Sequence, residues 1–175
     1  MERVLSSEVV YQGRLFRVRK DELEMVAGRK VIREVVEHPG AVAIVPLLED
    51  GSVIMVEQYR HPARKTLLEI PAGTLAKGES PEECARRELM EETGMKAKEL
   101  KKLLQCYVAP GYSTELIHIF VAKGLSKAEA KPEFDEHIKT SRLKLPTIID
   151  MIKKGEIEDA KTICAILILE AMRPR

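Results

Sequence analysis

Apolar residues at the start of the chain fall into short runs with the composition of β-strands. Residues 13–25 and 29–38 are rich in β-forming residues and lie on either side of the turn residue Gly28. Two such runs around a glycine turn predict an N-terminal hairpin.

The middle of the chain continues with strand-like runs. Residues 40–60 contain two apolar segments around Asp50-Gly51, a dipeptide typical of hairpin turns. Residues 103–110 and 116–125 predict two more strands, joined by a turn-like Pro-Gly-Tyr-Ser sequence. We therefore expect several strands before the C-terminal part of the chain.

Three segments predict helices, over residues 81–93, 146–154 and 160–173. Strands and helices mix without the regular alternation of a doubly wound fold, so the fold class is α+β or a mixed sheet enclosed by helices. The polar segment 126–141 lacks apolar periodicity and is expected to be a mobile loop.

Composition narrows the class of protein. The chain has 175 residues, 45% of them hydrophobic and 33% charged, with a net charge of +1. One domain over 1–175 is expected, and bulk charge gives no reason to expect a nucleic acid or an anionic membrane as partner. The absence of asparagine and the many Lys, Arg and Glu residues are a trend of heat-adapted proteins, although genome composition can produce the same bias.

The cysteines and the N-terminal residues indicate the cellular compartment. Cys84, Cys106 and Cys164 are odd in number and scattered, which favours free thiols over a disulfide framework or a zinc site. The first ten residues lack the apolar run of a signal peptide, and no segment approaches a membrane span. These features predict a cytoplasmic, soluble protein.

The helix predicted over 81–93 has clear ends. Ser80 is a good N-cap, Pro81 suits the first helical position, and Glu83 completes a capping box with Ser80. Gly94 is a natural C-terminal stop.

Three further glutamates lie in the second half of this helix. Glu88, Glu91 and Glu92 stand near the negative end of the helix dipole and share an arc of about 100°. A solvated face paired with Arg86 and Arg87 is one interpretation. The other is a site for a hard divalent cation, which prefers such oxygen ligands.

The loop before the helix favours the metal site, because a glycine-rich turn can add a backbone carbonyl to the ligands. With that loop, residues 73–95 resemble the Nudix box, Gx5Ex7REUxEExGU, in which U is a bulky aliphatic residue, and every fixed position matches. The resemblance implies a site for Mg²⁺, with Mn²⁺ as an option, and hydrolysis of a nucleoside diphosphate linked to another group. The implied fold is a Nudix α/β/α sandwich around a mixed sheet, with the N-terminal hairpin as an extension.

The resemblance also implies roles for residues. Glu88 and Glu92 would be the main metal ligands, Glu91 would be shared or bind a second metal, and Ala72 would supply its carbonyl. Glu91 and Glu92 would thereby belong to the catalytic set. Glu79 and Arg87 would pair to hold the loop against the helix.

Four segments outside the box are similar to the ADP-ribose pyrophosphatase subgroup: residues 33–47, 56–73, 109–115 and 155–166. Pro110, fifteen residues after Met95, has the spacing associated with that subgroup. The similarity implies cleavage of ADP-ribose to AMP and ribose 5-phosphate. It also implies a homodimer, in which strands within about 1–38 take part and 39–175 form the catalytic core.

The subgroup implies four substrate-binding residues. Arg60, after a strand, would grip phosphate through its planar guanidinium, although a surface arginine is the alternative. Arg33 would contact the adenosine half, unless it only pairs with Glu34 or Glu37. Gly111 and Glu115 match positions that line the ribose and phosphate pocket, and a simple turn is the alternative for Gly111.

The general base is expected in the polar loop. Glu136 matches best, with Glu133 and Asp135 as alternatives, and His137 is interpreted as incidental. The remaining histidines and the cysteines are interpreted as packing or surface residues: His38, His61, His118, Cys84, Cys106 and Cys164.

Three alternatives to ADP-ribose hydrolysis stay open. The same chemistry can act on an ADP- or GDP-sugar or on 8-oxo-GDP. A catalytically inactive Nudix module can bind a nucleotide as a regulator. The acidic helix can also be purely structural, without a metal.

Overall fold

The computed structural model describes residues 2–26, 28–128 and 138–173. It divides into two compact units. Met1–Gly40 with Cys106–Ile117 form the N-terminal unit, and Ala41–Gln105 with His118–Arg175 form the core unit.

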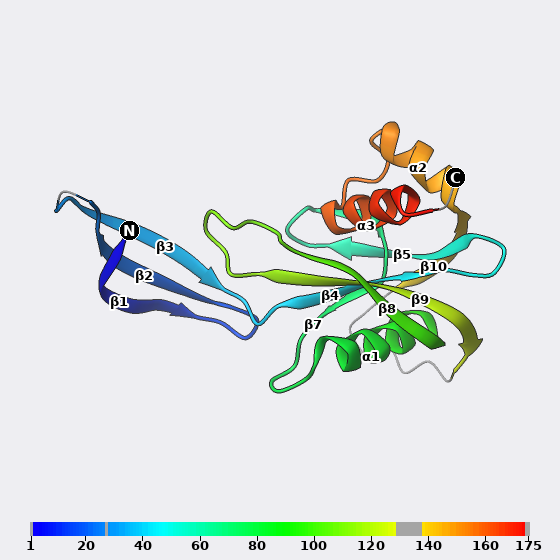
Figure 1. Ribbon diagram of the computed structural model, residues 1–175, viewed down its shortest axis with the longest axis horizontal. Coiled ribbons are helices and arrows are strands. Elements are labelled where there is room, and N and C mark those ends of the chain that lie inside the picture. Colours follow the sequence, from blue (N-terminus) through cyan, green and yellow to red (C-terminus); the bar gives the residue numbers. More distant parts are fainter. Residues whose placement is uncertain (1, 27, 129–137, 174–175) are drawn as a thin grey trace. The chain divides into compact units, whose positions relative to one another are not determined.

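The N-terminal unit is built on a three-stranded antiparallel sheet in the order β1-β2-β3 (Figure 1). Its strands are β1 (Arg3–Gln12), β2 (Arg17–Glu24) and β3 (Lys30–Glu37). The predicted hairpin is β2–β3, and Gly28 in its turn has φ 77°, a left-handed conformation that glycine adopts readily. β1 adds a third strand that the hydrophobic pattern did not single out.

The core unit contains two sheets. The four-stranded sheet has the order β7-β4-β9-β8, and the three-stranded sheet has the order β10-β5-β6. The strands are β4 (Ala41–Pro46), β5 (Ser52–Arg60), β6 (Lys65–Glu69), β7 (Ala72–Thr74), β8 (Met95–Tyr107), β9 (Leu116–Lys127) and β10 (Lys139–Lys144). β9 confirms the strand predicted over 116–125, and β8 contains part of the strand predicted over 103–110 but starts at Met95 and ends at Tyr107. The short strands β6, β7 and β10 were not predicted.

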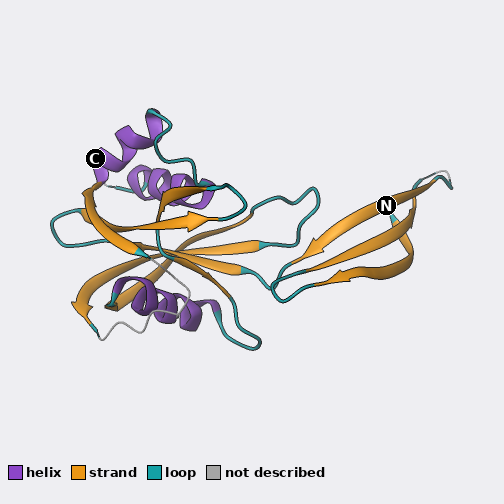
Figure 2. Ribbon diagram, turned by 180° about the vertical axis from the view of Figure 1, so that it is seen from behind, coloured by secondary structure: helices purple, strands orange, loops and turns teal. Residues whose placement is uncertain are grey.

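Three helices cover the sheets of the core unit. They are α1 (Pro81–Thr93), α2 (Leu145–Lys153) and α3 (Ala160–Ala171), within two residues of the predicted segments. α1 packs on one side of β4, whereas α3 packs on the other side and α2 lies beside α3 (Figures 1 and 2). This arrangement confirms the predicted α/β/α sandwich.

β4 lies at the centre of this sandwich, and all six of its residues are buried. Helices on both faces explain why its sequence, AVAIVP, is continuously apolar rather than alternating. On the α1 side the core consists of Val42, Ile44, Cys84, Ala85, Leu89, Phe120 and Ala122. This packing fixes α1 against β4 and β9.

The hairpin predicted over residues 40–60 is only partly correct. The turn forms, with the Gly51 amide donating to the Leu48 carbonyl at 3.0 Å. The strands then diverge: β4 and β5 enter different sheets, and a single bridge, Leu47 to Val53, joins them. Because β4 has β7 and β9 on its two edges, no edge is left for β5.

The polar segment 126–141 is described only at its ends. β9 runs to Lys127 and β10 starts at Lys139, so part of the expected loop is strand. Residues 129–137 lie outside the described residues. Among the described helices, none is long and apolar enough to span a membrane.

Candidate active site

The ends of α1 are fixed by its capping residues, as predicted. The Ser80 hydroxyl accepts from the Glu83 amide at 3.3 Å, and the Glu83 carboxylate accepts from the Ser80 amide at 2.9 Å. At the other end, Gly94 has a left-handed φ of 66° and donates to the Met90 carbonyl. These caps set which glutamates face the sheet.

Glu88 faces the short strand β7 directly. Its exposed fraction is 9%, and a Cβ added to Gly73 would lie 1.9 Å from the Glu88 carboxyl carbon. No side chain fits there, because real Cβ atoms essentially never approach other atoms so closely. The first glycine of the box thus makes room for a carboxylate.

Glu92 lies one turn further along the same face of α1. It is 7% exposed, and its carboxylate accepts from the Ala72 amide at 3.1 Å. Ala72 is therefore in contact with the helix, as required of a residue that would lend its carbonyl to a metal.

Arg87 holds the loop and the acidic face together. Its guanidinium donates to Glu79 at 2.8 and 3.0 Å, to Glu88 at 2.6 Å and to Glu91 at 2.9 Å. The bond from Arg87 lowers the pKa of Glu79 to about 2, and the same bond is the largest cause of the raised pKa of Arg87. The predicted pair of Glu79 and Arg87 is present.

The donor set fits a hard divalent cation. The carboxylates of Glu79, Glu88 and Glu91 bond to one guanidinium, and two acids of this face, Glu88 and Glu92, are buried next to the loop before α1. Within the described residues, no three acidic, His or Cys side chains are grouped closely enough to form a metal cage by themselves. Glu88 and Glu91 both accept from Nη1 of Arg87 in this structure.

Arg60, predicted to bind phosphate, ends β5 and is about one-third exposed. Its guanidinium donates through Nε and Nη2 to the two oxygens of Glu69, both at 2.8 Å. The bond to Glu69 is the largest cause of its raised pKa, and the nearby carboxylate of Glu92 acts in the same direction. Arg60 thus belongs to the same region of the core unit as the acidic face of α1.

The other predicted substrate residues belong to the N-terminal unit. Arg33 is half-exposed on β3 and pairs with Glu2 at 3.5 Å rather than with Glu34 or Glu37. Gly111 lies in a turn, and a Cβ added to it would meet no other atom within 4 Å. The amide of Glu115 donates to the Ser113 hydroxyl at 3.1 Å. Their roles stay predictions.

The residues proposed for the general base lie outside the described residues: Glu133, Asp135, Glu136 and His137. The cysteines are free. Burial raises the pKa of the Cys84 thiol to about 12, which suits the packing role predicted for it.

Sequence reasoning missed Glu69 and its partner Lys161. Glu69 is 1% exposed and bonds to both Arg60 and Lys161. The available signal was the subgroup similarity of residues 56–73 and 155–166, which contain these two residues.

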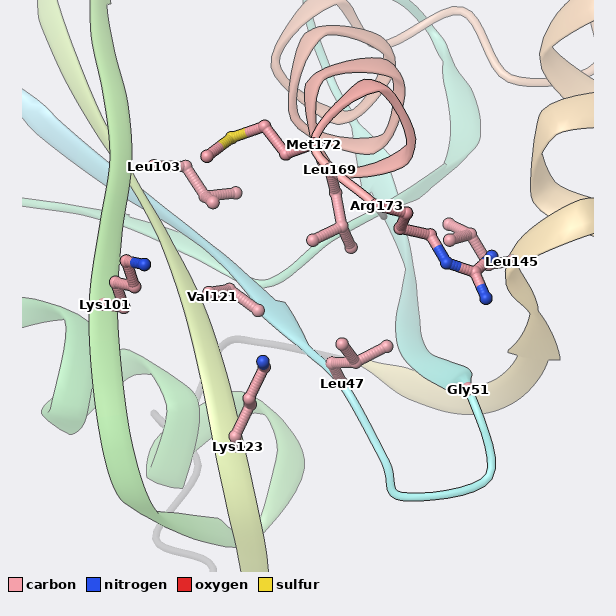
Figure 3. Close-up of a pocket in the computed structure, with 10 residues that line it drawn as sticks. All are labelled: Leu47, Gly51, Lys101, Leu103, Val121, Lys123, Leu145, Leu169, Met172 and Arg173. Carbon is pink, nitrogen blue, oxygen red and sulfur yellow. The ribbon is translucent and has the colours of Figure 1, made fainter. Parts of the chain in front are cut away.

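A separate pocket of about 310 Å³ opens beside the end of α3 (Figure 3). Its walls are largely apolar, with Lys101, Lys123 and Arg173 among them, and the other lining residues are Leu47, Gly51, Leu103, Val121, Leu145, Leu169 and Met172. It contains none of the predicted site residues, so the acidic face of α1 lies elsewhere.

Comparisons with known proteins agree with this geometry. Residues 37–166 match the NUDIX domain, and residues 2–36 match the nucleoside diphosphate sugar hydrolase N-terminal domain. The chain is 40% identical to the ADP-ribose pyrophosphatase of Bacillus subtilis (strain 168) and to the methanol dehydrogenase activator of Bacillus methanolicus. Each of these matches covers 97% of this chain and 92% of the relative.

A solved structure, described as an ADP compounds hydrolase, has a similar fold. It superposes with a TM-score of 0.86 at 28% identity, over 97% of this chain and 92% of that one. With a domain match that spans most of the sequence, this chain belongs to the Nudix family.

Proposed function

We propose that this chain hydrolyses the pyrophosphate bond of ADP-ribose to give AMP and ribose 5-phosphate, with Mg²⁺ as its cofactor. The observation that carries the proposal is the burial of Glu88 and Glu92 against Ala72 and Gly73, at the spacing of the Nudix box. The similar proteins named ADP-ribose pyrophosphatase and ADP compounds hydrolase support the substrate class.

Glu88, Glu91, Glu92 and the Ala72 carbonyl would hold the metal. When bound, a divalent cation screens the pyrophosphate charge and polarises its phosphoryl oxygens. The Arg87–Glu79 pair keeps the loop closed against α1, so the carboxylates stay in place.

Arg60 would bind the pyrophosphate. Two of its N–H groups point at Glu69, and a guanidinium has five, so donors remain for an anionic ligand. Arg33, Gly111 and Glu115 would serve the adenosine and ribose ends.

Glu136 would act as the general base and take a proton from the attacking water. The water oxygen then forms a bond to phosphorus while the bridging P–O bond breaks. A positioned base contributes about 10²–10⁴-fold to rate. A Glu136→Gln variant with wild-type kcat would contradict this role.

The test is a steady-state comparison of ADP-ribose, ADP-glucose, GDP-mannose and 8-oxo-GDP with Mg²⁺ at neutral pH. ADP-ribose is expected to have the highest kcat/KM, because a site built to hydrogen-bond one ligand leaves polar groups unpaired with another. A tenfold advantage for a GDP-sugar or 8-oxo-GDP would overturn the substrate and leave the metal chemistry in place.

The functional unit would be a homodimer joined through the N-terminal strands. These strands expose several large apolar side chains, a composition suited to an interface: Val4, Val9, Val10, Tyr11 and Ile32. Sedimentation velocity should give twice the chain mass, and a stable monomer at micromolar concentration would contradict the proposal.

A second candidate is a regulator that acts by binding a nucleotide. The relative named methanol dehydrogenase activator favours it, since it matches this chain as well as the pyrophosphatase does. Turnover distinguishes the two: a regulator binds ADP-ribose without releasing AMP.

A further inference from the structure

The segment 155–166 has no part in the catalytic roles given above. Asp159 caps α3 by accepting from the Thr162 amide at 3.0 Å and the Thr162 hydroxyl at 2.5 Å. Lys161 turns back and bonds to Asp159 at 2.9 Å and to Glu69. The first turn of α3 is thus tied to the end of β6.

The first turn of α3 also bonds to Ile70, the residue that follows Glu69. The amide of Ile70 donates to the Thr162 hydroxyl at 2.9 Å, and the Pro71 carbonyl accepts from the Ile44 amide at 2.8 Å. Two residues after Ile70, the Ala72 amide bonds to Glu92. Glu69 therefore stands at the start of a segment that is fixed at each step up to the acidic face of α1.

Glu69 is almost fully buried, yet both its oxygens are occupied by cations. Arg60 binds it through two parallel bonds of 2.8 Å, and Lys161 adds a third donor. Two parallel bonds fix the plane of a guanidinium as well as its distance. Arg60 is thereby held in one orientation, with its remaining donors turned away from Glu69.

We propose that Glu69 is a positioning residue that aims Arg60 at the pyrophosphate of the substrate, and that Asp159, Lys161 and Thr162 in the first turn of α3 hold Glu69 in place for this task. The proposal rests on the substrate role of Arg60 given above. Residues 159–162 would thus support substrate binding by Arg60 without contacting the substrate.

A double-mutant cycle in KM tests the proposal. Arg60→Ala, Glu69→Gln and the double variant are compared with ADP-ribose and Mg²⁺. Hydrogen bonds to charged groups contribute about 1.5–3 kcal/mol, so each single change should raise KM about 10- to 100-fold, with a smaller effect on kcat. The double variant should resemble Arg60→Ala, because Glu69 has nothing to aim once Arg60 is gone.

The matched control is Glu158→Gln, which removes an exposed carboxylate paired with Lys65 beside the same helix turn. Its KM should equal that of the wild type. Should Glu69→Gln fail to give a cooperative melt, Glu69→Asp keeps the buried charge but withdraws it by one methylene. It should then show the rise in KM in a folded protein.

Several results would overturn the inference. One is an unchanged KM in folded Glu69→Gln or Glu69→Asp while Arg60→Ala raises it. Another is a double variant whose loss is the product of the single losses, which indicates a general structural role. An unchanged KM in Arg60→Ala also removes the inference but leaves the hydrolysis intact, whereas wild-type protein that releases no AMP contradicts the proposed function itself.

Discussion

The charged cluster on α1 and the cluster at the start of α3 are built from similar residues, but their balance of charge differs. On α1, Arg87 bonds to Glu79, Glu88 and Glu91, while Glu92 bonds to a backbone amide. At α3, two acids, Glu69 and Asp159, meet two cations, Arg60 and Lys161.

The two clusters therefore use buried charge in different ways. A balanced cluster can be stable by itself, because each desolvated ion has a close partner. An acid-rich cluster costs stability until a cation joins it, which suits a binding role. We expect changes in the first cluster to affect activity and changes in the second to affect stability as well.

The largest expected effect is on the α1 side, from Glu92→Gln. Loss of the charge of a metal ligand should lower kcat/KM by at least about 100-fold, since even outer-shell partners of metal ligands are worth 10- to 100-fold. The melting temperature without metal should stay the same or rise slightly, because acid repulsion is relieved. Enzyme kinetics and calorimetry measure the two quantities.

A matched control for Glu92→Gln is Glu82→Gln on the same helix, where the acid is exposed and pairs with Arg86. It should retain wild-type kcat/KM. Near-normal turnover in Glu92→Gln would remove the distinction between the clusters, because the acid excess would then have no catalytic purpose.

The next effect is on the α3 side, from Lys161→Met. This change leaves Glu69 with one cation and Asp159 without its close ion pair; the Lys161 side chain is only 15% exposed. Breaking a buried pair costs 3–5 kcal/mol, and partial exposure reduces this to about 2–3 kcal/mol. The melting temperature should fall by about 4–12 °C for a chain of this size.

Lys65→Met is the control, since Lys65 and Glu158 form an exposed pair next to the same turn. Exposed pairs contribute about 0–1 kcal/mol, so this variant should melt close to the wild type. Equal decreases in the melting temperature of the two variants would show that the ion pairs of Lys161 stabilise the fold no more than an exposed pair does.

The smallest effect is expected from Glu79→Gln, in the change of melting temperature with falling pH. The pKa of Glu79 lies at about 2 in the folded chain and at 4.5 ordinarily, so the ionised form is favoured by folding. Its contribution is fully present above pH 4.5 and is lost as the pH falls toward 2. The difference in melting temperature between the wild type and Glu79→Gln should shrink across that window, and a constant difference would contradict the role of the Arg87 bond.

Sequence-based prediction was most accurate for α1, where helix-capping residues and the Nudix box lie in the same segment. α1 has the predicted bounds because Ser80, Glu83 and Gly94 fix its ends by contacts within a few residues. The acidic face follows from helix geometry, so Glu88 and Glu92 could be identified without the fold.

Contacts between distant residues explain what was missed. In the sequence Glu69 is one polar residue at the end of a short strand, and its partner Lys161 lies 92 residues later. The separation of β4 from β5 likewise depends on β7 and β9, which a two-strand pattern around Asp50-Gly51 does not reveal.

The irregular register of β1 has a consequence for solubility. β1 is the edge strand of its sheet, and its pairing with β2 skips Leu5 and Val10, so the strand bulges twice. A long, flat, apolar edge invites unrelated chains to add as further strands and start aggregates, whereas bulges twist such an edge and interrupt its ladder of free backbone groups. The bulges at these two residues therefore protect this edge strand, which carries three valines, against uncontrolled growth of the sheet.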